Sequence, residues 1–389
     1  TAQSGLGFGA TLTIIIHTTK GHHMHPLKVG IIGTGQIAQH HMRVWTEFDD
    51  FEIAVICDVD QEALERSAKK FGVSETTTDF REVINRDDII AVDVCLHNNL
   101  HAPIAIAAME AGKHVYCEKP IAGSYVDGVA MIEAAERTGR MLHIQLNTLF
   151  KDFVHASKQL IDNGALGEIY HARVTAHRRR GRPYIDGYGT NRFVQKAQAG
   201  GGALYDIGIY NIAQMLYLIG NPEVERICGR TFQKMAMDPG REATANYDVE
   251  ELGMGFINFK NGIAMDLIIS WAIHMNPFEG SYLVGDKGGI RLEPFSFHNL
   301  TCDLEMDSTV NLRAMESRRH MMDEHASAYD CSQKHWAAVL QDKVPLIPTA
   351  KLALNTMLIQ EGVYLSEELK REVTAAEVIE RSASTAVKL

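Results

Sequence analysis

Short apolar runs alternate with amphipathic stretches through the first part of the chain. The apolar runs that suit β-strands lie at 27–32, 51–57, 89–96, 114–117 and 141–146. The stretches that suit helices lie at 61–71, near 103–110 and at 125–138. Strands that alternate with helices are typical of βαβ units, which build a parallel sheet with helices on both faces. We therefore expect a doubly wound α/β domain over 26–150.

The pattern changes after residue 150. Strand-like segments follow one another at 168–178, 224–231, 251–259, 263–272 and 281–284. Successive strands favour an antiparallel sheet, and Asn261-Gly262 between two of them predicts a type I′ hairpin turn. We expect an α+β domain over 151–345, in which helices cover one face of an open, mainly antiparallel sheet. The other face is predicted to pair with a second copy in a homodimer or homotetramer.

The two ends of the chain differ from these domains. Helical patterns recur near 325–341 and at 349–369, and we assign 346–389 to a final helix and tail. Residues 1–25 contain one apolar run, Leu12 to Ile16, which is far shorter than the roughly 18 apolar residues of a membrane span. We interpret 1–25 as a leader or an extension added for expression, and expect no function for it.

Composition restricts the class of protein. Of the 389 residues, 46% are hydrophobic and 22% are charged, which is typical of a folded, soluble protein. The 38 Lys and Arg residues against 49 Asp and Glu residues give a net charge of -11, which disfavours a nucleic-acid partner. The six cysteines form no CxxC pair and mostly lie in apolar runs. We expect buried, reduced thiols, a cytoplasmic location and no membrane partner.

A glycine-rich turn follows the first strand. Gly33 permits the tight turn, Gly35 lets a pyrophosphate approach the backbone, and Ala38 keeps the following helix close to the strand. The turn residues expected to contact a dinucleotide are Gly33, Thr34, Gly35, Gln36 and Ile37. Asp58 ends the next strand twenty residues beyond Ala38, where a carboxylate binds the ribose 2′-hydroxyl. Because Asp58 would repel a 2′-phosphate, we expect NAD rather than NADP. The alternative is an ordinary βαβ turn with a surface aspartate.

A second glycine-rich segment precedes a helix expected at 203–219. Asp206 and Tyr210 are four residues apart, so they share a face that differs from the apolar face. Gly200, Gly201 and Gly202 favour close approach of a ligand or another backbone. The two side chains are therefore candidates for a cleft. Alternatively, Tyr210 is an ordinary amphipathic position and Asp206 only interacts with the helix dipole.

Further motifs give the chain a family resemblance. Glu118-Lys119-Pro120 follows a strand directly, Asn98-Asn-Leu-His101 follows another, and 200–210 read Gly-Gly-Gly-Ala-Leu-Tyr-Asp-Ile-Gly-Ile-Tyr. With the glycine turn and Asp58, these motifs resemble the glucose-fructose oxidoreductase and inositol dehydrogenase (Gfo/Idh/MocA) family. The resemblance implies a Rossmann NAD-binding domain, an oligomer, and a last helix that packs back onto the first domain.

The resemblance also implies roles for individual residues. It places Lys119 beside the nicotinamide and the substrate, and it makes Asp206 and Tyr210 the rest of the catalytic group. Asn98, His101, Glu118 and Lys119 are expected on the cofactor side. The chain departs from the family at Leu96-His97, at 147–150, where many members carry an Arg, and at Tyr210, where His is more frequent.

Two segments are candidates for substrate contacts. The only dense basic patch, 177–184, contains Arg178 and Tyr184 and precedes the helix that carries Asp206. It either lines the cleft or forms a solvated loop. Trp271 and His274 follow a strand and are candidates to stack on or hydrogen-bond a sugar, although core packing is the alternative for Trp271.

These residues predict reversible hydride transfer between NAD and a secondary hydroxyl carbon of a carbohydrate or polyol. The alcohol proton must leave too, and Tyr210 is the first candidate base, because a nearby Lys119 cation favours its phenolate. Lys119 itself is the alternative base. Rival functions are redox-assisted glycoside cleavage without net NADH formation, and a non-catalytic sensor, which the intact Lys119 disfavours. No histidine and carboxylate group has metal-ligand spacing, so no metal is expected.

Overall fold

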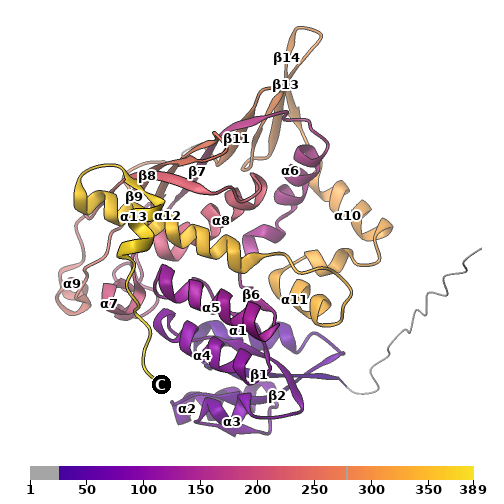
Figure 1. Cartoon of the computed structure of the whole chain (residues 1–389), viewed down its shortest axis with the longest axis vertical. Coiled ribbons are helices and arrows are strands. Elements are labelled where there is room, and N and C mark those ends of the chain that lie inside the picture. Colours follow the sequence, from indigo (N-terminus) through magenta and orange to yellow (C-terminus); the bar gives the residue numbers. More distant parts are fainter. Residues whose placement is uncertain (1–25, 277–278) are drawn as a thin grey trace, which may run out of the picture.

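The computed structural model describes residues 26–276 and 279–389, which form two β-sheets joined by helices (Figure 1). The expectation for 1–25 lies outside the described residues. In the view of Figure 1, the first sheet lies below the second, and the long C-terminal helix runs between them.

The first sheet is parallel throughout, as predicted. Its order is β3-β2-β1-β4-β5-β6. The strands are β1 Leu27–Ile32, β2 Phe51–Cys57, β3 Thr76–Thr77, β4 Ile89–Val94, β5 His114–Cys117 and β6 Leu142–Ile144. The order reverses direction between β1 and β4, and ligands of such sheets bind at the carboxyl ends of strands beside this point.

Helices lie between these strands: α1 Gln36–Trp45, α2 Gln61–Phe71, α3 Phe80–Ile84, α4 Asn98–Glu110 and α5 Tyr125–Thr138. The helix predicted near 103–110 is α4, which begins earlier, at Asn98. Pro103 lies inside α4 and has no N–H to give to the carbonyl of Asn99. Val387 of the C-terminal tail donates its N–H to that carbonyl instead (3.1 Å), so a remote segment completes this helix.

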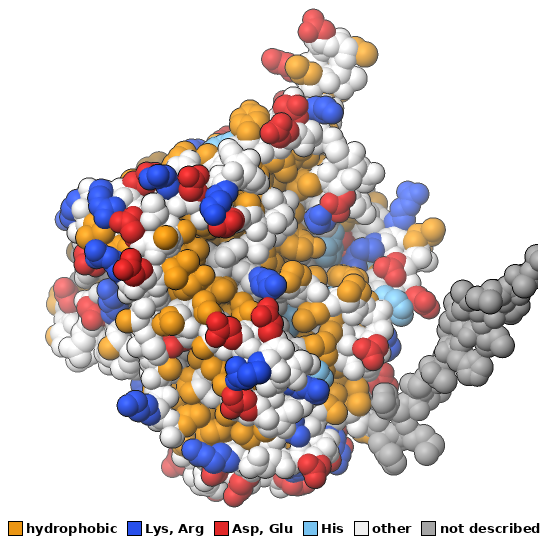
Figure 2. Space-filling model, viewed as in Figure 1, with side chains coloured by type: hydrophobic (Ala, Val, Ile, Leu, Met, Phe, Trp, Pro, Cys, Tyr) orange, Lys and Arg blue, Asp and Glu red, His pale blue; other side chains and the backbone are white. Residues whose placement is uncertain are grey.

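The second sheet has nine strands in the order β14-β13-β12-β11-β7-β10-β9-β8-β15. Every neighbouring pair is antiparallel except β7 and β10. The strands are β7 Ile169–His177, β8 Val224–Phe232, β9 Leu252–Phe259, β10 Ala264–Ser270, β11 Tyr282–Gly285, β12 Gly288–Arg291, β13 Ser296–Thr301, β14 Leu304–Thr309 and β15 Val373–Thr374. The hairpin of β13 and β14 projects at the top of Figures 1 and 2, where acidic and hydrophobic side chains mix at its tip.

The turn between β9 and β10 corrects the predicted turn type. Gly262 has a φ of 89°, but Asn261 does not take the left-handed conformation that a type I′ turn needs. The Asn261 side chain accepts the Ile263 N–H instead (3.3 Å), and the Gly262 N–H donates to the Phe259 carbonyl (3.0 Å).

The remaining helical segments lie in the second half of the chain. They are η1 Asn147–Phe150, α6 Asp152–Asp162, η2 Asn191–Val194, α7 Lys196–Ala199, η3 Leu204–Gly208, α8 Ile209–Leu218, α9 Pro239–Ala245, α10 Leu312–Met322, η4 Ala326–Tyr329, α11 Ser332–Leu340, α12 Thr349–Leu369 and α13 Ala375–Arg381. The predicted helix 203–219 is a π-helical turn, η3, followed by α8. The α12 helix contacts α5 and β6 of the first sheet's layer and β8 of the second sheet. One apolar core therefore continues through both halves.

The outer face of the second sheet is open in its centre. Met254 and Phe256 of β9 point outward beside Cys228 of β8, and Phe256 is 45% exposed. Pairing of two copies through this face stays a prediction. The six thiols are all free, but Cys228 and Cys302 are exposed, which corrects the expectation of buried cysteines. None of the helices in the described ranges is long and apolar enough to cross a membrane.

The arginines of the basic segment 177–184 lie in two different environments. Arg178 lines a cavity described below, whereas Arg182 is 1% exposed. Arg182 pairs with Asp186 (3.0 Å) and Glu251 (3.0 Å) and donates to two backbone carbonyls. The sequence did not distinguish these arginines, because the carboxylate of Glu251 comes from a strand far along the chain.

We expect Arg182→Met to destabilise the fold by about 3–5 kcal/mol, because it leaves buried carboxylates without their cation. Urea denaturation measures the change. Arg179→Met, at an exposed neighbour, is the control and is expected to stay within about 0.5 kcal/mol. Equal stability of both variants would contradict a structural role for the Arg182 ion pairs.

Candidate functional site

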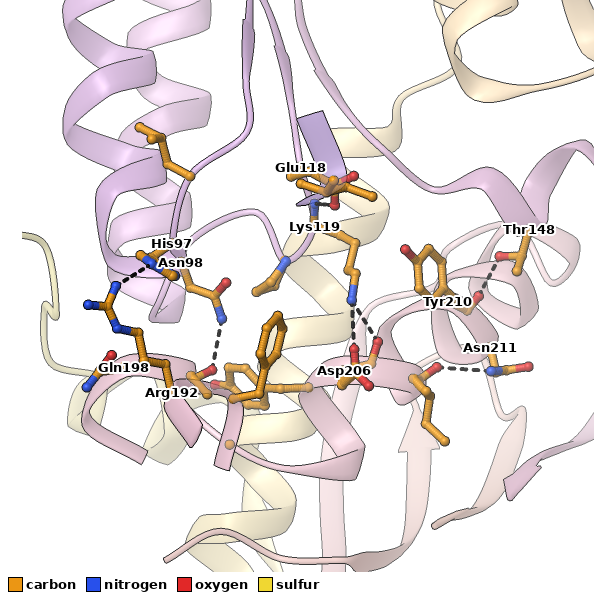
Figure 3. Close-up of a pocket in the computed structure, with 18 of the residues that line it drawn as sticks. His97, Asn98, Glu118, Lys119, Thr148, Arg192, Gln198, Asp206, Tyr210 and Asn211 are labelled. Carbon is orange, nitrogen blue, oxygen red and sulfur yellow. Dashed lines mark hydrogen bonds and ion pairs between the residues drawn. The ribbon is translucent and has the colours of Figure 1, made fainter. Parts of the chain in front are cut away.

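A cavity of about 430 Å³ lies where both halves of the chain meet. The first half lines it with Ile37, Leu96, His97, Asn98, Glu118, Lys119, Pro120 and Thr148. The second half adds Arg178, Arg192, Phe193, Gln198, Ala199, Gly201, Tyr205, Asp206, Ile207, Tyr210 and Asn211. Figure 3 shows Lys119 in the middle of the site, with His97 and Arg192 on one side and Tyr210 and Thr148 on the other.

The glycine turn at the start of α1 leaves its backbone open on one side. Gly33 has a φ of 96°, and a Cβ there would lie 2.3 Å from the Cys95 carbonyl oxygen. Gly35 is the N-cap of α1, and nothing lies within 4 Å of where its Cβ would be. No side chain caps this helix, so its first N–H groups remain available to an anion.

Asp58 closes the same turn from the end of β2. Its Oδ2 accepts the Thr34 N–H (2.7 Å) and the Thr34 hydroxyl (2.8 Å), and its Oδ1 accepts the Asp60 N–H (3.0 Å). The carboxylate therefore fixes the turn and presents negative charge beside it. This placement fits the ribose end of a dinucleotide that lies across the turn.

Lys119 and Asp206 form an ion pair that joins the two halves. The Lys119 Nζ lies 3.0 Å from Asp206 Oδ1 and donates to the Asp206 carbonyl (3.0 Å). Trp271 Nε1 donates to Asp206 Oδ2 (3.0 Å), so both carboxylate oxygens have a donor. Burial alone would lower the pKa of Lys119, but Asp206 raises it above its usual value. Burial alone would likewise raise the pKa of Asp206, but Lys119 holds it below its usual value.

A buried glutamate shapes the backbone that carries Asp206. The Glu250 carboxylate accepts the N–H groups of Gly202 (2.9 Å) and Leu204 (2.8 Å) and the Tyr364 hydroxyl (2.7 Å). A Cβ at Gly202 would lie 1.9 Å from the Glu250 carbonyl oxygen. The glycines therefore allow close approach of another backbone, which the sequence left open beside approach of a ligand.

Tyr210 stands beside the Lys119 ammonium. The Lys119 Nζ lies 4.9 Å from the centre of the Tyr210 ring, and Thr148 Oγ1 donates to the Tyr210 carbonyl (2.9 Å). Burial raises the pKa of Tyr210 to about 12, although Lys119 acts in the opposite direction. Lys119 favours the phenolate, as expected, but desolvation outweighs the cation, so the net shift of the pKa is upward. Tyr210 is a neutral phenol near pH 7.

Two further residues expected on the cofactor side, Asn98 and His101, differ in position: Asn98 lines the cavity and His101 does not. Asn98 lines the cavity, and its Nδ2 donates to the Ala199 carbonyl (2.8 Å). His101 is fully buried, and its ring nitrogens contact the carbonyl oxygens of Pro120 (2.8 Å) and Leu96 (3.1 Å). It supports the Lys119-Pro120 segment and does not line the cavity, and its contact with the cofactor stays a prediction.

Of the four residues expected to contact the substrate, one lines the cavity. Arg178 lines the cavity and donates to the Tyr188 hydroxyl (2.5 Å). Trp271 is fully buried and reaches the site only through Asp206. Tyr184 shares a hydrogen bond with Thr244, and His274 is exposed. Neither of these two residues lines the cavity.

Sequence reasoning missed Arg192, Phe193 and Gln198. Arg192 Nη1 lies 3.2 Å from His97 Nε2, so the second half reaches the loop after β4. Burial and Arg192 lower the pKa of His97, which leaves that ring neutral. Arg192 places a cation in the cavity of a chain that has no arginine at 147–150. The sequence feature that pointed to Arg192 was its position shortly before the glycines at 200–202.

Comparison with family models and curated proteins agrees with this geometry. The model of the GFO/IDH/MocA oxidoreductase family with an NAD-binding Rossmann fold matches residues 27–146, and that of the GFO/IDH/MocA C-terminal domain matches 154–291. The chain is 33% identical over 279 residues to D-glucoside 3-dehydrogenase of Escherichia coli, covering 69% of this chain and 78% of that protein. It is 31% identical over 266 residues to levoglucosan dehydrogenase of Pseudarthrobacter phenanthrenivorans, covering 61% and 66%.

Solved structures share the fold. Levoglucosan dehydrogenase in complex with NADH and levoglucosan superposes with a TM-score of 0.75 at 24% identity, covering 90% of this chain and 100% of that one. GenD2 from gentamicin A biosynthesis in complex with NAD gives a TM-score of 0.71 at 24% identity, covering 91% and 97%.

We expect Gly33→Ala to weaken NADH binding by at least about tenfold, because its Cβ would push the turn away from β4. NADH fluorescence measures the dissociation constant. Gly72→Ala is the matched control. Gly72 also has a positive φ, 69°, with nothing within 4 Å of its Cβ, so only its backbone strain of about 1–2 kcal/mol is added. Unchanged NADH affinity in a folded Gly33→Ala protein would contradict the assignment of the turn.

Proposed function

Because this chain belongs to the GFO/IDH/MocA family of oxidoreductases, whose first domain is an NAD-binding Rossmann fold, we propose that it is an NAD-dependent dehydrogenase of sugars, polyols or glycosides. The observation that carries the proposal is the convergence of Lys119, Asp206 and Tyr210 in one cavity beside the glycine turn. The reaction is reversible hydride transfer at a secondary hydroxyl carbon.

The residues of the first domain fit a dinucleotide. The uncapped start of α1 and the open space at Gly35 suit the pyrophosphate, and Asp58 suits the adenosine ribose. We propose that NAD is preferred over NADP, because Asp58 already accepts donors from the turn and would repel a 2′-phosphate. When bound, the nicotinamide supplies a carbon that accepts or returns the hydride.

The polar groups of the cavity suit a hydroxylated substrate. Lys119, Tyr210, Asn211 and Arg178 carry donors or acceptors on its wall, and apolar Ile207 lies among them. Relatives named for action on D-glucosides, levoglucosan and myo-inositol support a carbohydrate or polyol. Arg178, which donates to the Gly181 carbonyl and the Tyr188 hydroxyl, is the candidate for orienting the distal part of the substrate.

The protonation states assign a task to each side chain. Lys119 is an ammonium and Tyr210 a phenol, so both donate to a substrate oxygen. In the reductive direction they stabilise and protonate the developing alkoxide. In the oxidative direction one of them must first lose a proton, because the alcohol proton has to leave with the hydride. Asp206 keeps the ammonium in place, and Trp271 keeps Asp206 in place.

Lys119→Ala and Tyr210→Phe are each expected to reduce kcat by about 10² or more, while NADH still binds, because both groups act on the substrate oxygen.

Wild-type oxidation is expected to accelerate from about pH 7 to about pH 10, since the base form of a group with a raised pKa becomes more populated. Steady-state kinetics across pH measure both effects. Near-normal turnover in both variants would contradict the assignment.

A panel of sugars, polyols and glycosides, followed by NADH absorbance with NAD and with NADP, tests the function itself. We expect net NADH formation with at least one free sugar or glycoside, and kcat/KM at least about tenfold lower with NADP. Release of an aglycone without net NADH would instead establish redox-assisted glycoside cleavage. Absence of both reactions across the panel would contradict the proposal.

A further inference from the structure

A buried group of ionisable side chains lies directly behind Lys119 and reaches the cavity wall at Glu118. His41 of α1 is 0% exposed and stands between two carboxylates, Asp93 of β4 and Glu118 at the end of β5. Its Nδ1 lies 3.0 Å from Asp93 Oδ1, and its Nε2 lies 2.9 Å from Glu118 Oε1. Both acidic side chains are almost fully buried too.

The two contacts fix the charge of the His41 ring. A neutral imidazole has one N–H, so it can donate to only one carboxylate, whereas an imidazolium donates to both. Burial alone would lower the pKa of His41, but Asp93 raises it well above its usual value. Burial alone would likewise raise the pKa of Glu118, but His41 holds it below its usual value. The geometry therefore corresponds to a buried cation between two anions.

Asp93, the member of the group farthest from Lys119, has hydrogen-bond donors at both of its carboxylate oxygens. Asp93 also accepts the Trp45 indole N–H (2.9 Å) and the Cys95 thiol (3.3 Å). The ring of Tyr116 packs against His41 with 5.5 Å between ring centres. No metal ion is needed to explain His41, Asp93 and Cys95, because hydrogen bonds between them account for their proximity.

Glu118 is the member of the group nearest to the Lys119 side chain, and both of its carboxylate oxygens have donors. Glu118 Oε1 is engaged by His41, and Glu118 Oε2 accepts the backbone N–H of Lys119 (2.9 Å). Both Glu118 oxygens are engaged by these donors, and in the described residues the ion pair of the Lys119 side chain is with Asp206 and not with Glu118. The ammonium pairs with Asp206 of the other domain instead.

We propose that His41, held by Asp93, is a positioning residue for the dehydrogenase: it neutralises Glu118 and thereby leaves the Lys119 ammonium to Asp206 and the substrate. The inference rests on the proposed function for its kinetic consequences. Without the imidazolium, the uncompensated Glu118 carboxylate draws the adjacent ammonium towards itself and away from Asp206.

Another buried histidine provides the comparison. His143 of β6 is also 0% exposed, but its ring contacts the hydroxyl groups of Ser332 (2.9 Å) and Thr349 (3.2 Å) and no carboxylate. Burial lowers the pKa of His143 well below its usual value. The pKa values of two equally buried histidines of one domain thus shift in opposite directions, because His41 lies between acids and His143 lies between hydroxyl groups.

The kinetic test compares His41→Gln with His143→Gln. Gln keeps one donor but carries no charge, so His41→Gln is expected to reduce kcat by about tenfold or more while the NADH dissociation constant changes by less than about threefold. His143→Gln is the control for a buried histidine, with kcat within about threefold of wild type. Full activity in a folded His41→Gln protein would overturn the proposal.

A double variant separates charge neutralisation from simple support of the fold. Removing the Glu118 charge in His41→Gln/Glu118→Gln removes the competing anion, so kcat is expected to recover by at least about threefold over His41→Gln alone. Losses that multiply in the double variant would overturn the proposal, because two independent structural defects behave in that way.

A measurement on the wild-type protein does not depend on activity or on any variant folding. In ¹⁵N NMR of histidine-labelled protein at neutral pH, we expect both ring nitrogens of His41 to be protonated and those of His143 to show a neutral ring. A neutral His41 would overturn the inference. If the wild-type enzyme oxidises no substrate of the panel, the proposed function fails, and the NMR result still decides the charge of His41.

Discussion

The ion pair between Lys119 and Asp206 is the contact on which the site depends. Lys119 lies two residues after the end of β5 in the first sheet, and Asp206 lies in the π-helical turn η3 of the second domain. Their side chains are only 15% and 22% exposed, so each charge would be costly without the other. Any relative displacement of the two halves would separate the pair, and α12, which packs on both, opposes such a displacement.

The pair is the end of a longer line of alternating charges. Asp93, His41, Glu118, Lys119 and Asp206 follow one another from the interior of the first domain to the second. An indole N–H donates to the carboxylate at each end, from Trp45 to Asp93 and from Trp271 to Asp206. Each charge has an opposite neighbour, which is how ionised groups can be buried without large pKa reversals. Of this line, Glu118 and Lys119 line the cavity from the first domain and Asp206 lines it from the second.

Local patterns in the sequence, together with the family resemblance, were enough to find part of the site, but not Arg192, Phe193 and Gln198 of the cavity wall. The glycine turn, Asp58, Lys119, Asp206 and Tyr210 all lie at strand ends or on one helix face, where spacing along the chain determines position. The caps of α2 and α5 likewise made their bounds predictable: Asp60 and Ser124 cap their starts, and glycines in the left-handed conformation end them.

Features that depend on remote contacts were not predictable in this way. His41, Asp93 and Glu118 come from three different parts of the chain, and Glu250, which shapes the turn at Gly202, lies 48 residues further along the chain. The pKa of Tyr210 was expected to fall beside a cation, but its direction follows from desolvation, which the sequence does not reveal. The Asn99 carbonyl in the first turn of α4 finds its donor in Val387, nearly three hundred residues away along the chain.

The central claim is that the ammonium of Lys119 and the phenol of Tyr210 flank the reacting carbon of a bound dinucleotide while Asp206 holds the ammonium. A crystal structure of the complex with NADH tests this most directly. We expect the nicotinamide ring to lie in the cavity between Lys119 and Tyr210, with the Lys119–Asp206 contact intact. A nicotinamide bound outside this cavity, or a Lys119 side chain turned away from Asp206 and Tyr210, would contradict it.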